Sequence, residues 1–157
     1  MSTFVPARRR HDGARQHFAI VASQFNAEYV QGLVDHASEE LRAISPGSDI
    51  ALHHVPGAFE IPVVVRELAL QEKVDAIIAM GVIIRGKTAH AEHIGRAVTD
   101  ALQRLAIAHG VPIIHAVLSV DDEEQARERC LGSRINRGTE AARTAVEIAG
   151  VMAELRR

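Results

Sequence analysis

Residues 75–84 decide the fold class; they read Asp75-Ala76-Ile77-Ile78-Ala79-Met80-Gly81-Val82-Ile83-Ile84. This apolar run, rich in β-branched residues, predicts a strand that is buried on both faces, as in parallel sheets. Similar runs predict strands at residues 18–22, 50–55 and 113–120. Apolar residues at helical spacing predict helices at about residues 30–41, 61–68, 94–105, 121–130 and 142–152, with a basic loop at 131–138. The alternation predicts an α/β sandwich, a four-stranded parallel sheet with helices on both faces.

Length and composition restrict the class of protein further. The 157 residues suit one domain, and 47% hydrophobic with 24% charged residues is typical of a soluble globular protein. A net charge of −2 disfavours nucleic acid as a partner, and no apolar run approaches the ~20 residues that span a membrane. The single cysteine, Cys130, indicates a reducing, cytoplasmic location. We expect a mobile N-terminal arm at residues 1–15 and one domain at 16–157.

A nucleotide-binding pattern occurs at residues 81–88. Gly81-Val82-Ile83-Ile84-Arg85-Gly86-Lys87-Thr88 matches G-x-x-x-x-G-K-T between a predicted strand and a predicted helix. A P-loop must leave the extended conformation to surround a phosphate, whereas the three β-branched residues after Gly81 favour a strand. A P-loop nucleotide-binding protein is therefore the alternative hypothesis. The first helical turn after Gly86 still offers free N–H groups to a single phosphate.

His90 follows this pattern and lies in or near the first turn of the next predicted helix. The positive end of the helix dipole disfavours imidazolium there, so the ring is a candidate base near pH 7. A surface histidine beside a helix end is the simpler interpretation of an isolated His. A metal site at His90 and His93, with His53 or His54, lacks a third ligand at a recognisable spacing, so we predict no metal.

Sequence blocks near the predicted strand ends carry a resemblance to one family. The blocks are Ser23–Asn26, Val55–Pro62, Gly81–His90, Glu124–Ala126 with Glu128–Arg129, and Asn136–Gly138. Over residues 18–152 the chain resembles lumazine synthases. The resemblance implies a flavodoxin-like three-layer fold and a condensation without cofactor. In that reaction 5-amino-6-(D-ribitylamino)uracil and 3,4-dihydroxy-2-butanone 4-phosphate give 6,7-dimethyl-8-ribityllumazine and phosphate, in riboflavin biosynthesis.

The resemblance also implies how the pyrimidine substrate is bound. Phe25 would stack on the pyrimidine ring, and Val82 with Ile83 would offer it backbone groups. Glu60 would accept hydrogen bonds from the ribityl hydroxyls, which suits a carboxylate with several acceptor sites. The other residues implied on this side are Asn26, Ala58 and Phe59.

For the phosphate and the proton transfers, the resemblance implies a second group of residues. Lys87 and Thr88 would hold the phosphate with helix N–H groups, and Arg129 would bind it through a bidentate fork. His90 would carry protons during imine formation and phosphate loss. Together these residues predict one anion site and one proton carrier at the same edge of the sheet.

Five positions depart from the usual family pattern. His115 stands where the family has a Phe that the neighbouring subunit contributes to the site, and Arg137 replaces a Lys. Ala91 and His93 replace aromatic residues around His90, and Glu92 replaces an Asp. We expect these departures to affect substrate affinity more than reaction type.

The family resemblance implies an oligomer as well. Its active sites lie between subunits of a five-membered ring, so a homopentamer is the expected minimum unit. The length of the 131–138 loop is compatible with a 60-subunit icosahedral capsid, and a free pentamer and a decamer are the alternatives. Riboflavin synthase is an expected partner. A flavin-binding or shell-forming relative without turnover is the non-enzyme alternative.

Overall fold

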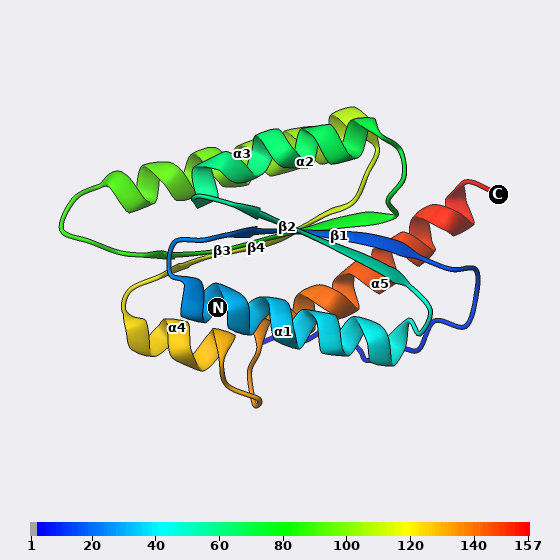
Figure 1. Ribbon diagram of the computed structural model, residues 1–157, viewed down its shortest axis with the longest axis horizontal. Helices are drawn as coiled ribbons and strands as arrows, with labels where there is room; N and C mark the ends of the chain where they lie inside the picture. The colour runs from blue at the N-terminus through cyan, green and yellow to red at the C-terminus, as the bar shows by residue number, and fades with distance from the viewer. Residues whose placement is uncertain (1–2) are drawn as a thin grey trace.

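The computed structural model describes residues 3–157 and shows one parallel sheet between two layers of helices (Figure 1). The strands are β1 His17–Ser23, β2 Asp49–Val55, β3 Ala76–Ile84 and β4 Ile113–Val120. Their order across the sheet is β2-β1-β3-β4, and every neighbouring pair is parallel. This architecture confirms the predicted α/β sandwich.

Helices cover both faces of the sheet (Figure 1). One face carries α2 Ile61–Leu70 and α3 His90–His109, with the short 3-10 helix η1 Ala58–Glu60 just before α2. The other face carries α1 Ala27–Ile44, α4 Glu123–Cys130 and α5 Arg137–Leu155. Within the described residues no helix combines the length and the apolar character needed to cross a membrane.

Alternating side chains of the central strands build two separate cores. On β3, Ile78 and Met80 pack toward α1, α4 and α5, whereas Ile77 and Ala79 pack toward α2 and α3. All four side chains are fully buried. Burial on both faces explains why residues 75–84 are so uniformly apolar.

The conformation of β3 contradicts the P-loop alternative. Val82, Ile83 and Ile84 remain in the strand and pair with Leu118, Ser119 and Val120 of β4. A P-loop would need these residues to curve around a phosphate. On the other side of β3, the pairing with β1 ends at Met80. The β1-facing backbone edge of residues 81–84 is therefore outside the β1 ladder.

Two helix starts differ from the sequence expectation. α4 begins at Glu123, after an Asp122 cap whose carboxylate accepts a hydrogen bond from the Gln125 N–H at 2.8 Å. α5 begins at Arg137, inside the stretch expected to be a loop. Its cap is Asn136, whose Oδ1 accepts from the N–H groups of Gly138 at 2.9 Å and Thr139 at 3.2 Å. The connection between these helices is thus shorter than the predicted 131–138.

Helix α1 lies unusually close to both α4 and α5. A Cβ on Gly32 of α1 would overlap the Cys130 carbonyl, and a Cβ on Gly138 of α5 would overlap the Leu33 carbonyl. Tyr29 adds a polar contact, since its hydroxyl donates to Glu123 Oε1 at 3.2 Å. These contacts fix α4 and the start of α5 against a buried helix.

The N-terminal segment contacts the layer of α1 and α5. The buried Glu40 carboxylate accepts from Arg8 Nε at 3.1 Å and from Arg143 Nε at 2.5 Å. Arg143 also donates to the Pro6 carbonyl at 3.3 Å. Arg8 is therefore an ion-pair partner of Glu40 and does not extend freely into solvent.

Candidate active site

A cavity of about 420 Å³ opens where the carboxyl ends of β1, β2 and β3 meet the start of α3. Eight predicted site residues line it: Phe25, Asn26, Ala58, Phe59, Glu60, Val82, Ile83 and His90. Ser23, Gly57, Ile84, Ala91 and Ile94 complete the lining and were not predicted as site residues. Ser23 and Gly57 lie inside the sequence blocks quoted above, so their position in the motifs was the available signal.

The turn after β1 positions Phe25 and Asn26 at this cavity. Asn26 precedes α1, but with φ 59° it is left-handed and its side chain does not cap the helix. Its Nδ2 donates to the Val82 carbonyl at 2.7 Å, which ties the turn to β3. The Phe25 side chain is 69% exposed, and a Cβ on Gly57 would lie 2.9 Å from its ring. The absence of a side chain at position 57 thus leaves room for the Phe25 ring beside the cavity.

Glu60 projects into the cavity from the end of η1. Its Oε1 accepts a hydrogen bond from the Gly57 N–H at 2.9 Å. This bond holds the carboxylate in place, and Oε2 has no hydrogen-bond partner within residues 3–157. One oxygen of Glu60 therefore stabilises the start of η1, and the other is free to accept a hydrogen bond from a bound molecule.

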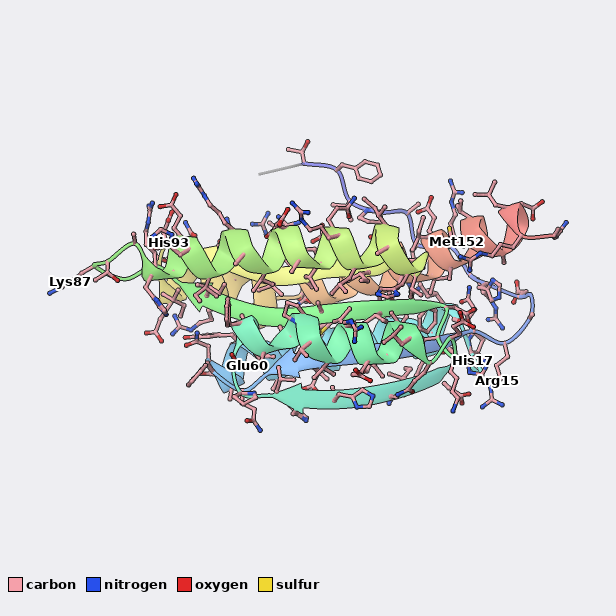
Figure 2. All side chains as sticks on the ribbon, turned by 90° about the horizontal axis from the view of Figure 1, so that it is seen from above. Arg15, His17, Glu60, Lys87, His93 and Met152 are labelled. Atoms are coloured by element: carbon pink, nitrogen blue, oxygen red, sulfur yellow. The ribbon has the colours of Figure 1, made fainter. Side chains whose placement is uncertain are left out.

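The loop between β3 and α3 carries Lys87 and Thr88. Figure 2 shows Lys87 at the outer tip of this loop, at the end of the molecule that also holds Glu60 and His93, away from Arg15 and His17. Thr88 Oγ1 accepts from the His90 N–H at 3.4 Å, and α3 begins at His90. The first N–H groups of α3 thus point toward this loop, as an anion site requires.

His90 is exposed at the cavity wall, and its ring makes no hydrogen bond to any described residue. The ring nitrogens are free to contact a bound molecule. Glu92, two residues further, forms an ion pair with Arg96 at 2.8 Å. Within residues 3–157 no group of three or more His, Cys, Asp or Glu is arranged to hold a metal ion.

Arg129 and Arg137 line a different cavity of about 430 Å³, beside the end of β4. Arg129 Nη1 donates to Gln125 Oε1 at 3.2 Å, whereas its Nε is buried without a partner among the described residues. Arg137 pairs with Glu140 through an Nη1–Oε2 contact of 2.7 Å. Among the described residues Arg137 is thus held by a carboxylate, whereas Arg129 is in no ion pair. Beneath it, burial raises the pKa of the Cys130 thiol to about 11, so this group stays neutral.

His115 lies on β4, in a groove of about 390 Å³ that Arg137 also lines. The Val117 N–H donates to His115 Nδ1 at 3.2 Å, so Nδ1 is unprotonated and Nε2 donates to Thr99 Oγ1 at 2.7 Å. Burial lowers the pKa of the ring, which favours the same neutral form. The imidazole is therefore a fixed neutral ring at the sheet edge.

The two groups of predicted residues do not meet within one chain. His90 starts α3, whereas Arg129 belongs to α4 on the opposite face of the sheet (Figure 1). The two cavities share no lining residue. A single chain thus presents a cavity of about 420 Å³ with His90 and, separately, an arginine-lined cavity at the β4 edge.

Comparison with known proteins identifies the family. The family model described as 6,7-dimethyl-8-ribityllumazine synthase matches residues 15–153. A protein of that name from Paraburkholderia phymatum is 39% identical over 145 residues, covering 92% of this chain and 82% of the relative. One from Syntrophus aciditrophicus is 37% identical over 139 residues, covering 88% and 90%. The match extends over both cavities and every predicted site residue, and the chain belongs to the 6,7-dimethyl-8-ribityllumazine synthase family.

Proposed function

We propose that this chain condenses 5-amino-6-(D-ribitylamino)uracil with 3,4-dihydroxy-2-butanone 4-phosphate. The products are 6,7-dimethyl-8-ribityllumazine, phosphate and two molecules of water. Family membership supports the reaction, and the grouping of eight predicted residues around one cavity carries the assignment of the site. The steps are amine addition to a ketone, loss of phosphate and ring closure, so the protein must mainly orient two substrates and move protons.

The 420 Å³ cavity is the proposed pyrimidine site. The exposed ring of Phe25 offers a face for stacking, and the unpaired β1-facing edge of β3 offers backbone groups to the heterocycle. Asn26 occupies one acceptor position of the Val82 carbonyl, which leaves the second acceptor position to the heterocycle, whereas the backbone groups of Ile83 face β4. Glu60 Oε2 accepts from ribityl hydroxyls, with Ala58 and Phe59 beside it.

The proposed phosphate site lies at the start of α3. Lys87, Thr88 and the free N–H groups of the first helical turn surround the place where the phosphate would sit. His90, on the same turn, takes a proton from the attacking amine and returns it to the hydroxyl that leaves as water. The phosphate then departs with the electron pair of its C–O bond, next to positive groups that stabilise it.

A second copy of the chain completes the proposed site. Arg129 lies on the opposite face from His90 and lines a separate cavity, so it would serve the cavity of a neighbouring copy. His115 and Arg137 lie along the same β4 edge and would face that copy too. We propose a homopentamer as the active unit, with further assembly into a 60-subunit shell, and sedimentation of the purified protein measures both.

Mixing the two substrates with the protein tests the function directly. We expect lumazine absorbance to appear together with one equivalent of phosphate. His90→Ala should reduce the rate by about 10²-fold or more, the usual contribution of a proton-transferring residue. His109→Ala, at the far end of the same helix, is the matched control and should behave as the unchanged protein. No product from the unchanged protein, or full turnover by His90→Ala, would contradict the proposal.

A further inference from the structure

Gln125 connects Arg129 to the end of β4. Its Oε1 accepts two hydrogen bonds, from the Asp121 backbone N–H at 2.9 Å and from Arg129 Nη1 at 3.2 Å. Its Nε2 donates to Asp121 Oδ2 at 3.3 Å. Because both neighbours of Oε1 can only donate, the orientation of the amide is fixed.

The backbone on either side of this contact, at the start of α4 and the end of β4, is also held in place by hydrogen bonds and an ion pair. The Asp122 carboxylate holds the Gln125 backbone N–H at 2.8 Å as the cap of α4. Asp121 follows directly after β4, and its carboxylate also lies 3.5 Å from Arg85 Nη1, in the loop that leads to Lys87 and Thr88. An ordinary i, i+4 pair on an exposed helix has no such attachment to a strand end.

This arrangement determines which nitrogen of the Arg129 guanidinium is free to bind a ligand. Nη1 is occupied by Gln125, whereas Nε is buried without a partner in the described part of the chain. Burial closes the Nε side to a ligand, whereas Nη2 is not buried and has no hydrogen-bond partner among the described residues, so it is the charged donor left for a phosphate oxygen. Nη2 remains available, and both Arg129 and Gln125 line the same cavity.

We propose that Gln125 is a positioning residue, which holds the Arg129 guanidinium so that its Nη2 group faces the phosphate of the ketone substrate. The inference rests on the proposed function, because it concerns the phosphate site of that reaction. Gln125 acts through Arg129 and is not required for the proton transfers at His90. Its loss should therefore weaken phosphate recognition and leave the pyrimidine site intact.

The effects of substitution follow from these contacts. Gln125→Met keeps the shape and removes the acceptor, so the guanidinium loses its fixed orientation. We expect the KM for the phosphate substrate to rise about tenfold, with kcat and the KM for the pyrimidine within about twofold. Gln125→Glu restores the acceptor but adds a carboxylate that competes with the phosphate for Arg129, so the KM should rise further. Glu124→Gln, exposed on the same helix, is the control and should change neither KM.

Arg129→Ala and the double variant separate this inference from the proposed function. Calorimetric binding of inorganic phosphate should weaken in Gln125→Met and Arg129→Ala, and the double variant should bind no worse than Arg129→Ala alone. Thermal unfolding of each variant verifies that the fold is intact. If Arg129→Ala weakens phosphate binding but Gln125→Met does not, the inference is wrong while the proposed site stands. If Arg129→Ala leaves phosphate binding and KM unchanged, the phosphate role of Arg129 is wrong, and the inference is wrong with it.

Discussion

Asn136 should contribute more to stability than any other single polar side chain near the arginine-lined cavity. It is buried and makes four hydrogen bonds. Oδ1 caps α5, while Nδ2 donates to the carbonyls of Cys130 at 3.0 Å and Gly132 at 2.9 Å. The side chain thus closes the end of α4 and opens α5 at once.

The magnitude follows from these contacts. Asn136→Ala removes the helix cap, at a cost of about 1 kcal/mol. It also leaves the Cys130 carbonyl without its donor in a buried position, which costs about 2 kcal/mol. The Gly132 carbonyl is partly accessible, and water can replace its lost donor. We expect the free energy of unfolding to fall by about 3 kcal/mol.

Urea unfolding followed by far-ultraviolet circular dichroism measures this change. The chain has no Trp and one Tyr, so fluorescence is a poor probe. All proteins are compared at the same concentration, because association contributes to apparent stability. Asn136→Asp keeps the cap and loses the Nδ2 donor, so it should lose about 2 kcal/mol. A loss below about 1 kcal/mol for Asn136→Ala would refute the reasoning, since even the cap alone is worth that much.

Three further predictions concern other parts of the chain. Gly138→Ala places a Cβ against the Leu33 carbonyl and should lower the free energy of unfolding by about 2 kcal/mol or more. Gly150→Ala, which has open space in the same helix, should stabilise the protein slightly. Thermal unfolding compares the two variants. Cys130 should resist alkylation at pH 8 in the folded protein and react in urea, because burial raises its pKa to about 11; mass spectrometry detects the adduct. Because the pKa of His115 is lowered in the folded state, the unfolded chain binds its proton first, and stability falls as the pH drops through about 6.5. His115→Gln should reduce this dependence in urea midpoints at pH 7.5 and 5.5, and an unaltered slope would contradict it.

The sheet was predictable because its signal is local. Residues 76–84 are apolar on both faces, which only a central parallel strand requires, and the same run argued against a P-loop. The strand limits agree with the predicted ranges to within one residue. Pairing partners and the end of the β1–β3 ladder at Met80 had no such local signal.

The helix starts were predicted less well because they depend on distant atoms. Asn is a residue type that favours helix caps, yet the Asn26 side chain donates instead to the Val82 carbonyl, 56 residues away. Gly138 looked like a loop residue, but it is glycine because α1 approaches it closely. Asn136 was overlooked as a cap although its bonds to the Gly138 and Thr139 N–H groups are local, because it lies inside the stretch that was predicted to be a loop.

The site residues on β1, η1 and β3 could be grouped from the sequence, since parallel strands end at one edge. Arg129 and Arg137 could be identified from the motifs, and His115 from its departure from the family pattern. The separation of Arg129 from His90 follows only from the placement of α4 on the opposite face. Gln125 was part of a quoted motif without a role, because its bond to the Asp121 N–H is visible only in the folded chain.

The placement of His90 and Arg129 on opposite faces of the sheet has a genetic consequence. If each site takes one of them from each of two copies, a cell that produces both a His90→Ala and an Arg129→Ala chain will form mixed oligomers. Some interfaces then combine an intact histidine from one chain with an intact arginine from the next. Two alleles that each abolish riboflavin synthesis should therefore complement one another, whereas two alleles that damage the same cavity should not.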